Sequence, residues 1–215
     1  MSYAIDPQTT WTAADLVHRF GPLPLSRLRH DPAPGTATEQ DVVFIHDREN
    51  RLYELVDNTL LEKAVGTYES YLAAVLVRVL GSFAADGDLG IVLGADGMLR
   101  LAPGLVRIPD ASFISWNRIA DRKIPDQPIA DLVPDLAVEV ISPGNTHEEM
   151  QRKLGEYFDA GVRLVWYIYP RTREVHVYTA AEVFQVLLQD ETLDAGDVLP
   201  GFSVSIAAIF GSPDK

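Results

Sequence analysis

The segment Leu136-Ala137-Val138-Glu139-Val140-Ile141 decides the fold of this chain. It is short, rich in β-branched residues and bounded by Pro134 and the turn Ser142-Pro143-Gly144-Asn145, a pattern that predicts a buried strand. Glu139 is out of place in such a strand. An ionised carboxylate left unpaired in a buried position is costly, so a cation, a metal ion or water must meet it. We therefore look for function around Glu139.

The residues after this strand predict a helix and a second strand. Thr146 and Glu149 form a capping-box pattern, and Gly161 is a helix-ending residue. Apolar residues recur at helical spacing on one face: Met150, Leu154, Tyr157 and Phe158. The apolar run Leu164–Ile168 follows, which makes a strand-helix-strand unit with parallel strands joined by a right-handed connection.

Lys153 is the basic residue closest to the buried stripe of this helix. It precedes Leu154 by one position, about 100° around the axis, and so lies on the flank of the stripe. From the flank, a lysine can reach over the edge of the sheet toward Glu139. The alternative is a surface lysine paired with Glu149 or Glu156.

Length and composition predict one globular core. The chain has 215 residues, of which 47% are hydrophobic, enough for a single domain. Residues 1–40 hold five of the fourteen prolines and show little periodicity, so we expect an N-terminal arm, partly irregular, with one short helix at Thr12–Phe20. Residues 41–215 are expected to form the single domain.

Several classes of protein are disfavoured. No apolar run approaches the length of a membrane span, and the first twenty residues lack the pattern of a secretory signal. The chain has no cysteine, which excludes disulfides and thiolate metal sites and fits a cytoplasmic location. The net charge of −13 argues against a general binder of nucleic acid. A local basic rim, or else an ordinary solvated face, is formed by Arg100, Arg107, Arg118, Arg122 and Lys123.

The first half of the chain predicts a hairpin, a long helix and further strands. Asp57-Asn58 is a two-residue turn between apolar runs, and Gly66-Thr67 begins the longest helical pattern, which runs to Phe83. Glu69 lies in its first turn, where an acid ordinarily favours the helix dipole. The runs Leu89–Leu93 and Met98–Leu101 predict a second hairpin. Arg107–Ser115 is expected to be one strand.

That strand carries a second carboxylate, Asp110. A Pro-Asp pair is common at turns and says little alone. If the strands bearing Asp110 and Glu139 are neighbours, two like charges at about 4 Å repel by roughly 4 kcal/mol at an effective dielectric near 20. A divalent cation would relieve this repulsion. Oxygen ligands without cysteine or clustered histidine favour Mg²⁺ or Mn²⁺ over zinc.

Several blocks of the sequence, in order, resemble one known family. They are Tyr53-Glu54-Leu55-Val56, Ile108-Pro109-Asp110-Ala111-Ser112-Phe113, Pro134 to Pro143, Arg152-Lys153-Leu154-Gly155-Glu156-Tyr157-Phe158 with Gly161-Val162, and Leu199-Pro200-Gly201-Phe202. Together they look like the Uma family of restriction-endonuclease-like proteins, over roughly residues 40–210.

The resemblance implies an α/β (α+β) restriction-endonuclease-like fold of the PD-(D/E)XK type, with a central mixed β-sheet flanked by helices. It implies that Asp110 and Glu139 bind Mg²⁺ or Mn²⁺, and that Glu69 matches a recurrent acid of the first helix that supports the metal site. The lysine of the nuclease pattern is absent, because Ile141 stands two residues after Glu139. Lys153 is the candidate for a migrated replacement.

The function implied is metal-dependent hydrolysis of phosphodiester bonds in nucleic acid, with DNA as the expected form. We expect no membrane partner, and a homodimer is one of the oligomeric states left open. Two alternatives remain: a catalytically inactive module of the same fold that binds nucleic acid or a protein, and a hydrolase of another phosphoester. Ile141 and the acidic composition favour the inactive module. The acids Asp110 and Glu139, with Lys153, favour the enzyme.

Overall fold

The computed structural model describes residues 11–64 and 66–211 and contains a six-stranded mixed sheet at its centre. The strand order is β11-β10-β9-β8-β6-β3. β8 (Leu136–Val140) and β9 (Leu164–Tyr169) are parallel and are connected through α4 (His147–Ala160). The other neighbours in this sheet are antiparallel. The strand-helix-strand unit predicted from the sequence is therefore confirmed.

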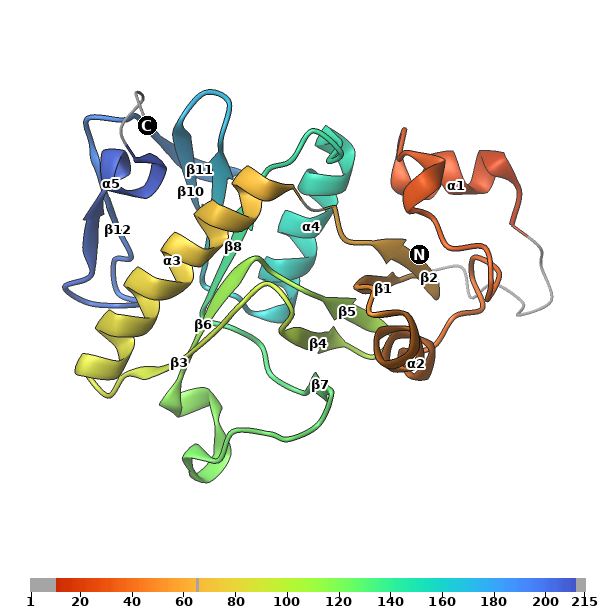
Figure 1. The fold of residues 1–215 in the computed structure, drawn as a ribbon, viewed down its shortest axis with the longest axis horizontal. Coiled ribbons are helices and arrows are strands. Elements are labelled where there is room, and N and C mark those ends of the chain that lie inside the picture. Colours follow the sequence, from red (N-terminus) through yellow and green to blue (C-terminus); the bar gives the residue numbers. More distant parts are fainter. Residues whose placement is uncertain (1–10, 65, 212–215) are drawn as a thin grey trace.

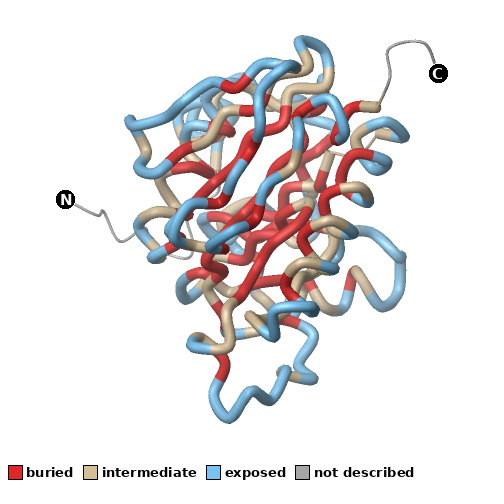
Figure 2. Tube along the Cα trace, turned by 90° about the vertical axis from the view of Figure 1, so that its left-hand side faces the viewer, coloured by how far each residue is buried: buried red, intermediate tan, exposed pale blue. Residues whose placement is uncertain are grey.

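Two helices cover the two faces of this sheet (Figure 1). α3 (Thr67–Asp86) packs Leu72, Leu76 and Leu80 on one face. α4 packs Met150, Leu154 and Tyr157 on the other. Buried residues of both layers line the strands between them, which Figure 2 shows as a continuous buried interior. Such a stack of helix, sheet and helix is the usual way to bury both faces of a sheet.

Alternation along β8 decides which helix meets Glu139. Leu136, Val138 and Val140 belong to the core formed with α3, whereas Ala137 belongs to the core formed with α4. Because successive side chains of a strand point to opposite faces, Glu139 shares the α4 face with Ala137. This parity puts Glu139 opposite Lys153.

A five-stranded sheet lies beside the first, in the order β2-β1-β5-β4-β7 (Figure 1). Its core includes Val42 and Ile45 of a covering helix, together with Leu55 and Val106. The bounds of these elements are α2 (Glu39–Glu49), β1 (Tyr53–Val56), β2 (Thr59–Glu62), β4 (Met98–Ala102), β5 (Leu105–Arg107) and β7 (Ile129–Ala130). The chain enters this sheet a second time after β3 (Gly90–Leu93) and leaves it into β6 (Ala111–Ser115).

The remaining elements lie around these two sheets. They are α1 (Ala13–Phe20), η1 (Leu25–Arg27), η2 (Trp116–Arg118), η3 (Ala120–Arg122), β10 (Glu174–Ala180), β11 (Val183–Leu187), β12 (Thr192–Asp194), β13 (Ser203–Ser205) and α5 (Ile206–Phe210). Within the described part of the chain, no helix combines the length and apolar character needed to cross a membrane.

The local signals of the sequence are confirmed in several places. Thr12 and Thr146 cap α1 and α4 with complete capping boxes. Asp57-Asn58 forms the turn between β1 and β2. α3 begins at Thr67 as predicted. The helical pattern of the sequence also puts Tyr68 and Tyr71 on the apolar face of this helix, which is wrong because both are exposed.

Two strand predictions are wrong for the same reason. The predicted hairpin of Leu89–Leu93 with Met98–Leu101 does not form, because β3 pairs with β6 and β4 pairs with β5. Arg107–Ser115 is not one strand either: β5 ends at Arg107 and β6 begins at Ala111. In both places the chain crosses from one sheet to the other, and a local pattern of strand and turn residues does not reveal which sheet a strand joins.

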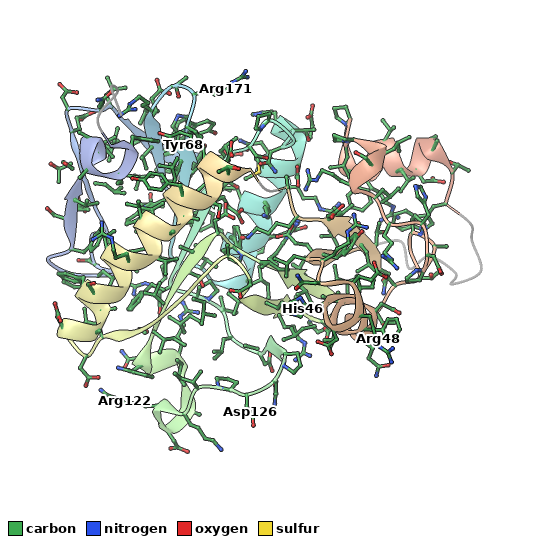
Figure 3. The ribbon with its side chains drawn as sticks, viewed as in Figure 1. His46, Arg48, Tyr68, Arg122, Asp126 and Arg171 are labelled. Atoms are coloured by element: carbon green, nitrogen blue, oxygen red, sulfur yellow. The ribbon has the colours of Figure 1, made fainter. Side chains whose placement is uncertain are left out.

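Of the two interpretations of the basic residues between Arg100 and Lys123, the structure favours the ordinary solvated face over a basic rim. Arg107 is buried, and Arg118 pairs with Asp135. Arg122 pairs with Asp88 at 2.7 Å and lies on the loop at the lower end of the molecule in Figure 3, far from Arg171 at the upper end. Most of these cations therefore neutralise acids of the same chain, as in the alternative of an ordinary charged face.

The arm before α2 is tied to α4 by one buried ion pair. Arg27 donates two hydrogen bonds of 2.7 Å to the carboxylate of Glu149, the capping-box residue of α4. Arg27 also donates to the backbone carbonyl of Gly144 at 2.9 Å. The division of the chain into an arm of residues 1–40 and a domain of residues 41–215 stays a prediction.

We expect Glu149→Gln to lower the free energy of unfolding by about 3 kcal/mol, because it leaves a buried arginine without its carboxylate. Burial acts to raise the pKa of Glu149, but the hydrogen bonds from Arg27 outweigh it and lower that pKa below its ordinary value of 4.5. The stabilisation is therefore fully present above about pH 4.5 and is lost as the pH falls through the folded-state pKa.

Chemical denaturation of both proteins between pH 3 and 7 measures this difference. Glu148→Gln is the control, since Glu148 is an exposed acid in the same helical turn and its removal should cost less than about 1 kcal/mol. Equal losses in the two variants at pH 7 would contradict the buried clamp.

Candidate active site

Asp110 lies where the chain crosses from the five-stranded sheet to the six-stranded sheet. Its backbone N–H donates to the carbonyl of Val138 at 2.9 Å, and the N–H of Val140 donates to its Oδ2 at 2.7 Å. The register Ala111↔Val138, continued by one residue, sets Asp110 opposite Glu139. The end of β8 therefore fixes the carboxylate of Asp110 beside that of Glu139.

Glu139 is buried on the α4 face of β8 and is held by two residues of α4. The ammonium of Lys153 lies 2.7 Å from Glu139 Oε1, and the hydroxyl of Tyr157 donates to the same oxygen. Lys153 and Tyr157 are four residues apart, so they lie on one side of the helix. Lys153 is thus neither a surface residue nor a partner of Glu149 or Glu156.

A second carboxylate, Glu54 of β1, shares this lysine. Glu54 Oε1 lies 3.0 Å from the ammonium of Lys153 and accepts a hydrogen bond from the N–H of Ile108 at 3.1 Å. Its Oε2 lies 2.7 Å from the guanidinium of Arg107, which also pairs with Glu156 of α4. The side chains of Glu54, Lys153 and Arg107 are all nearly inaccessible to solvent.

Asp110 has its own lysine. The ammonium of Lys63, just past the end of β2, lies 2.9 Å from Asp110 Oδ1. It also donates to the carbonyl of Ala95 at 2.9 Å. Asp110 and Glu139 therefore face separate lysines, which come from different parts of the chain.

The pKa values reflect this balance of burial and pairing. Burial raises the pKa of Glu139, and the negative charges of Asp110 and Glu54 add to the rise although Lys153 opposes it. Burial also acts to raise the pKa of Glu54, but Lys153 and Arg107 outweigh it and hold that pKa at about 2. For Lys153, burial acts to lower the pKa, and the carboxylates of Glu139 and Glu54 raise it above its ordinary value instead. Lys153 is therefore a fixed positive charge.

Glu69 is not brought into this network. Glu69 lies in the first turn of α3, the helix that covers the face of the sheet opposite α4. It lines a cavity of about 300 Å³ together with Ile141, Ser142 and residues of the β9–β10 turn. Among the described residues, no hydrogen bond or ion pair joins Glu69 to Asp110, Glu139 or Lys153.

The donor set suits a hard divalent cation with few protein ligands. Residues 11–64 and 66–211 contain no group of three or more histidine, cysteine or acidic side chains that could hold a metal ion. Asp110 and Glu139 supply carboxylate oxygens, the donors preferred by Mg²⁺ and Mn²⁺. Mg²⁺ is often bound through one or two carboxylates plus water and phosphate. The two acids fit that pattern and do not fit a dedicated all-protein cage.

The sequence analysis missed three residues of this network. Glu54 is a carboxylate inside an apolar strand, the same anomaly that drew attention to Glu139, so the same argument would have found it. Lys63 and Arg107 carry no such signal, because lysine at a strand end and arginine in a short strand are ordinary surface patterns. Only the structure reveals them, because it leaves 8% of Lys63 and 1% of Arg107 exposed to solvent.

We expect Glu54→Gln to destabilise the protein by about 3–5 kcal/mol, because it removes the carboxylate shared by two buried cations. Thermal and denaturant unfolding measure the loss. Glu62→Gln is the matched control on the neighbouring strand: Glu62 pairs with a half-exposed Arg51, and its loss should cost no more than about 1 kcal/mol. Similar losses of unfolding free energy for both variants would contradict the larger contribution that we assign to the buried pairing of Glu54.

Comparison with known proteins places this geometry in a family. A family model described as "Putative restriction endonuclease", Uma2, matches residues 40–207. The comparison with curated proteins finds no match. Among solved structures, one match is a protein from Anabaena variabilis ATCC 29413 described as "a putative nuclease belonging to DUF820", with a TM-score of 0.67 and 19% identity over 75% of this chain and 90% of that chain.

The structural match confirms the predicted fold class, a mixed sheet flanked by helices as in restriction-endonuclease-like nucleases. At 19% identity it speaks for the fold alone. The family match extends over well more than half of the 215 residues and includes Glu54, Lys63, Asp110, Glu139 and Lys153. The chain belongs to the Uma2 family of restriction-endonuclease-like proteins.

Proposed function

We propose that this protein is a nuclease that hydrolyses phosphodiester bonds of nucleic acid with the help of Mg²⁺ or Mn²⁺. DNA is the substrate that we expect. One observation carries the proposal: Asp110, directly before β6, lies opposite Glu139 of the neighbouring strand β8, and the ammonium of Lys153 lies 2.7 Å from Glu139. Two acids on adjacent segments, one of them in contact with a lysine, are the parts that metal-assisted phosphodiester hydrolysis requires.

Asp110 and Glu139 would hold the cation. When bound, a divalent ion supplies a water of lowered pKa and neutralises negative charge that develops on the phosphate. Val140 keeps Asp110 oriented through its N–H. Tyr157 and Lys153 keep Glu139 Oε1 in place, so neither carboxylate has to reorganise when substrate binds.

Lys153 would take the role left vacant by Ile141. Its flank position on α4 brings the ammonium to Glu139 from outside the strand, so that the lysine does not need to follow Glu139 in sequence. Glu54 holds this ammonium from the other side at 3.0 Å. A positive charge fixed in this way can orient a nucleophile or screen the charge of a phosphate. Lys153 would thus be a catalytic residue and Glu54 its positioning residue.

Glu69 keeps a secondary role in this proposal. It shares its cavity with Ile141 and Ser142, which directly follow the strand end that orients Asp110. The lining of this cavity continues directly from the end of β8 that carries Glu139, so Glu69 would support the site from the substrate side. A cytoplasmic location and a homodimer remain predictions from the sequence.

A second function has an observation in its favour. Both acids already carry a protein cation, Lys63 on Asp110 and Lys153 on Glu139. Such a site is close to neutral without any metal ion. A module of this fold that binds nucleic acid or a protein without cleaving it would need no metal ion to balance these acids.

Cleavage assays separate these functions. We expect wild type with Mn²⁺ to cut at least one form in a panel of single-stranded, double-stranded and branched DNA and RNA. Glu139→Gln and Lys153→Met should each reduce the rate at least about 100-fold, because each removes a charge that acts at the reacting phosphate. Lys123→Met is the control, since Lys123 is exposed and lies on the η3 loop.

Equal cleavage by wild type and Glu139→Gln would identify the activity as a contaminant. If wild type cuts no member of the panel, the proposed nuclease function is contradicted and the binding module is favoured over it.

Metal binding has a readout that does not depend on substrate. A ligand that binds only the folded state at 100 times its Kd stabilises that state by about 2.7 kcal/mol. We therefore expect Mn²⁺ to raise the Tm of wild type and to leave the Tm of Asp110→Asn unchanged. Asp126→Asn is the matched control, because Asp126 is an exposed acid on a distant loop (Figure 3). An equal Tm rise in all three proteins would place the ion elsewhere.

A further inference from the structure

Lys63 has a contact that the proposed reaction does not use. Its ammonium lies 2.9 Å from Asp110 Oδ1 with only 5% of the side chain exposed. The lysine comes from the five-stranded sheet, whereas Asp110 begins the return to the six-stranded sheet. The second contact of the ammonium, with the carbonyl of Ala95, is to the turn between β3 and β4. Lys63 is therefore held in place by two segments that are distant from it in the sequence.

The geometry of Asp110 leaves one oxygen for a cation. Oδ2 accepts a hydrogen bond from the N–H of Val140 at 2.7 Å, and Oδ1 is the oxygen that the ammonium of Lys63 contacts at 2.9 Å. A Mg²⁺ ion bound to Oδ1 would lie at about 2.0–2.1 Å from the oxygen. An ammonium and a divalent ion on the same oxygen would then be neighbours of like charge, which repel.

We propose that Lys63 is an internal cation that occupies Asp110 in the metal-free protein and competes with the divalent ion for Oδ1. Metal binding then requires the ammonium of Lys63 to move away, and Lys63 sets the affinity of the site. This inference rests on the proposed metal-dependent function and adds to it a residue that weakens metal binding in the absence of substrate.

The contacts of the two lysines explain why Lys63 is the one that moves. Lys153 pairs with two carboxylates, Glu139 and Glu54, and is enclosed between two strands and a helix. Lys63 pairs with one carboxylate and one neutral carbonyl. A lysine ammonium is a compact charge on a flexible four-carbon stem, so it can swing away without a change in the backbone. The ion pair with Asp110 is thus the weaker of the two.

Titration of Mn²⁺ into the full-length protein tests the competition. We expect Lys63→Met, which keeps the length of the stem and removes the charge, to bind Mn²⁺ roughly tenfold more tightly than wild type, because the ion no longer displaces a cation. Lys123→Met changes the net charge by the same amount at an exposed position and should bind Mn²⁺ like wild type. Isothermal titration calorimetry measures the Kd values, and circular dichroism checks the fold.

A second measurement uses wild type and does not depend on how a variant folds. Acetylation of lysines, followed by mass spectrometry, reports how accessible each ammonium is. Lys63 should be acetylated slowly without metal and faster at saturating Mn²⁺, while the rate at Lys123 stays constant.

A Lys63→Gln variant, which keeps a polar end next to Ala95, repeats the Mn²⁺ titration with a different substitution.

The outcomes separate the competition from the proposed function. If wild type binds Mn²⁺ at Asp110 but Lys63→Met binds it no more tightly and Lys63 is not exposed by the ion, the competition is wrong and the metal site stands. Mn²⁺ binding by the Lys63 variants and not by wild type supports the competition. If wild type and both variants bind no Mn²⁺, the metal site of the proposed function fails together with this inference.

Discussion

The pairing of buried carboxylates with buried cations is the constraint on which the rest of the structure depends. Glu54 and Glu139 lie on strands whose neighbouring residues are apolar, and Asp110 lies half-buried directly before β6. A buried carboxylate would be costly if left ionised without a partner. Lys63, Lys153 and Arg107 supply the partners. A buried ion pair rarely adds net stability compared with apolar residues of the same size. The network is therefore better understood as a device that fixes positions than as a source of stability.

This pairing also joins the two sheets. Glu54 belongs to the five-stranded sheet, Glu139 to the six-stranded sheet, and Lys153 to the helix that packs over both. Asp110 lies in the short crossover between them. The acids that resemble those of nucleases thus lie at the junction of the two sheets, and the added sheet is part of the site because it contributes Glu54 and Lys63.

The departure from the nuclease pattern at Ile141 has a structural answer. A lysine two residues after Glu139 would share its strand face. Here α4 packs on that face and places the ammonium of Lys153 next to the carboxylate of Glu139. The positive charge is therefore retained, although the lysine stands elsewhere in the sequence. The site is close to neutral as a result, since the lysines balance the acids. In the proposed function, a substrate phosphate would have to add ligands before such a site holds an ion firmly.

The sequence by itself determined the elements whose signals are local: the capped helix α4, the turn at Asp57-Asn58, the long helix α3 and the parallel unit of β8 and β9. It also indicated Glu139, since a carboxylate in an apolar strand is anomalous wherever the strand lies, and the order of several motifs indicated the family. Only the tertiary structure decided that β3 and β4 belong to different sheets, and that Glu54 and Lys63 pair with Lys153 and Asp110. The physical reason is that sheet partnership and the pairing of charges depend on segments far apart in the chain, and the local order of residues does not encode which of them meet.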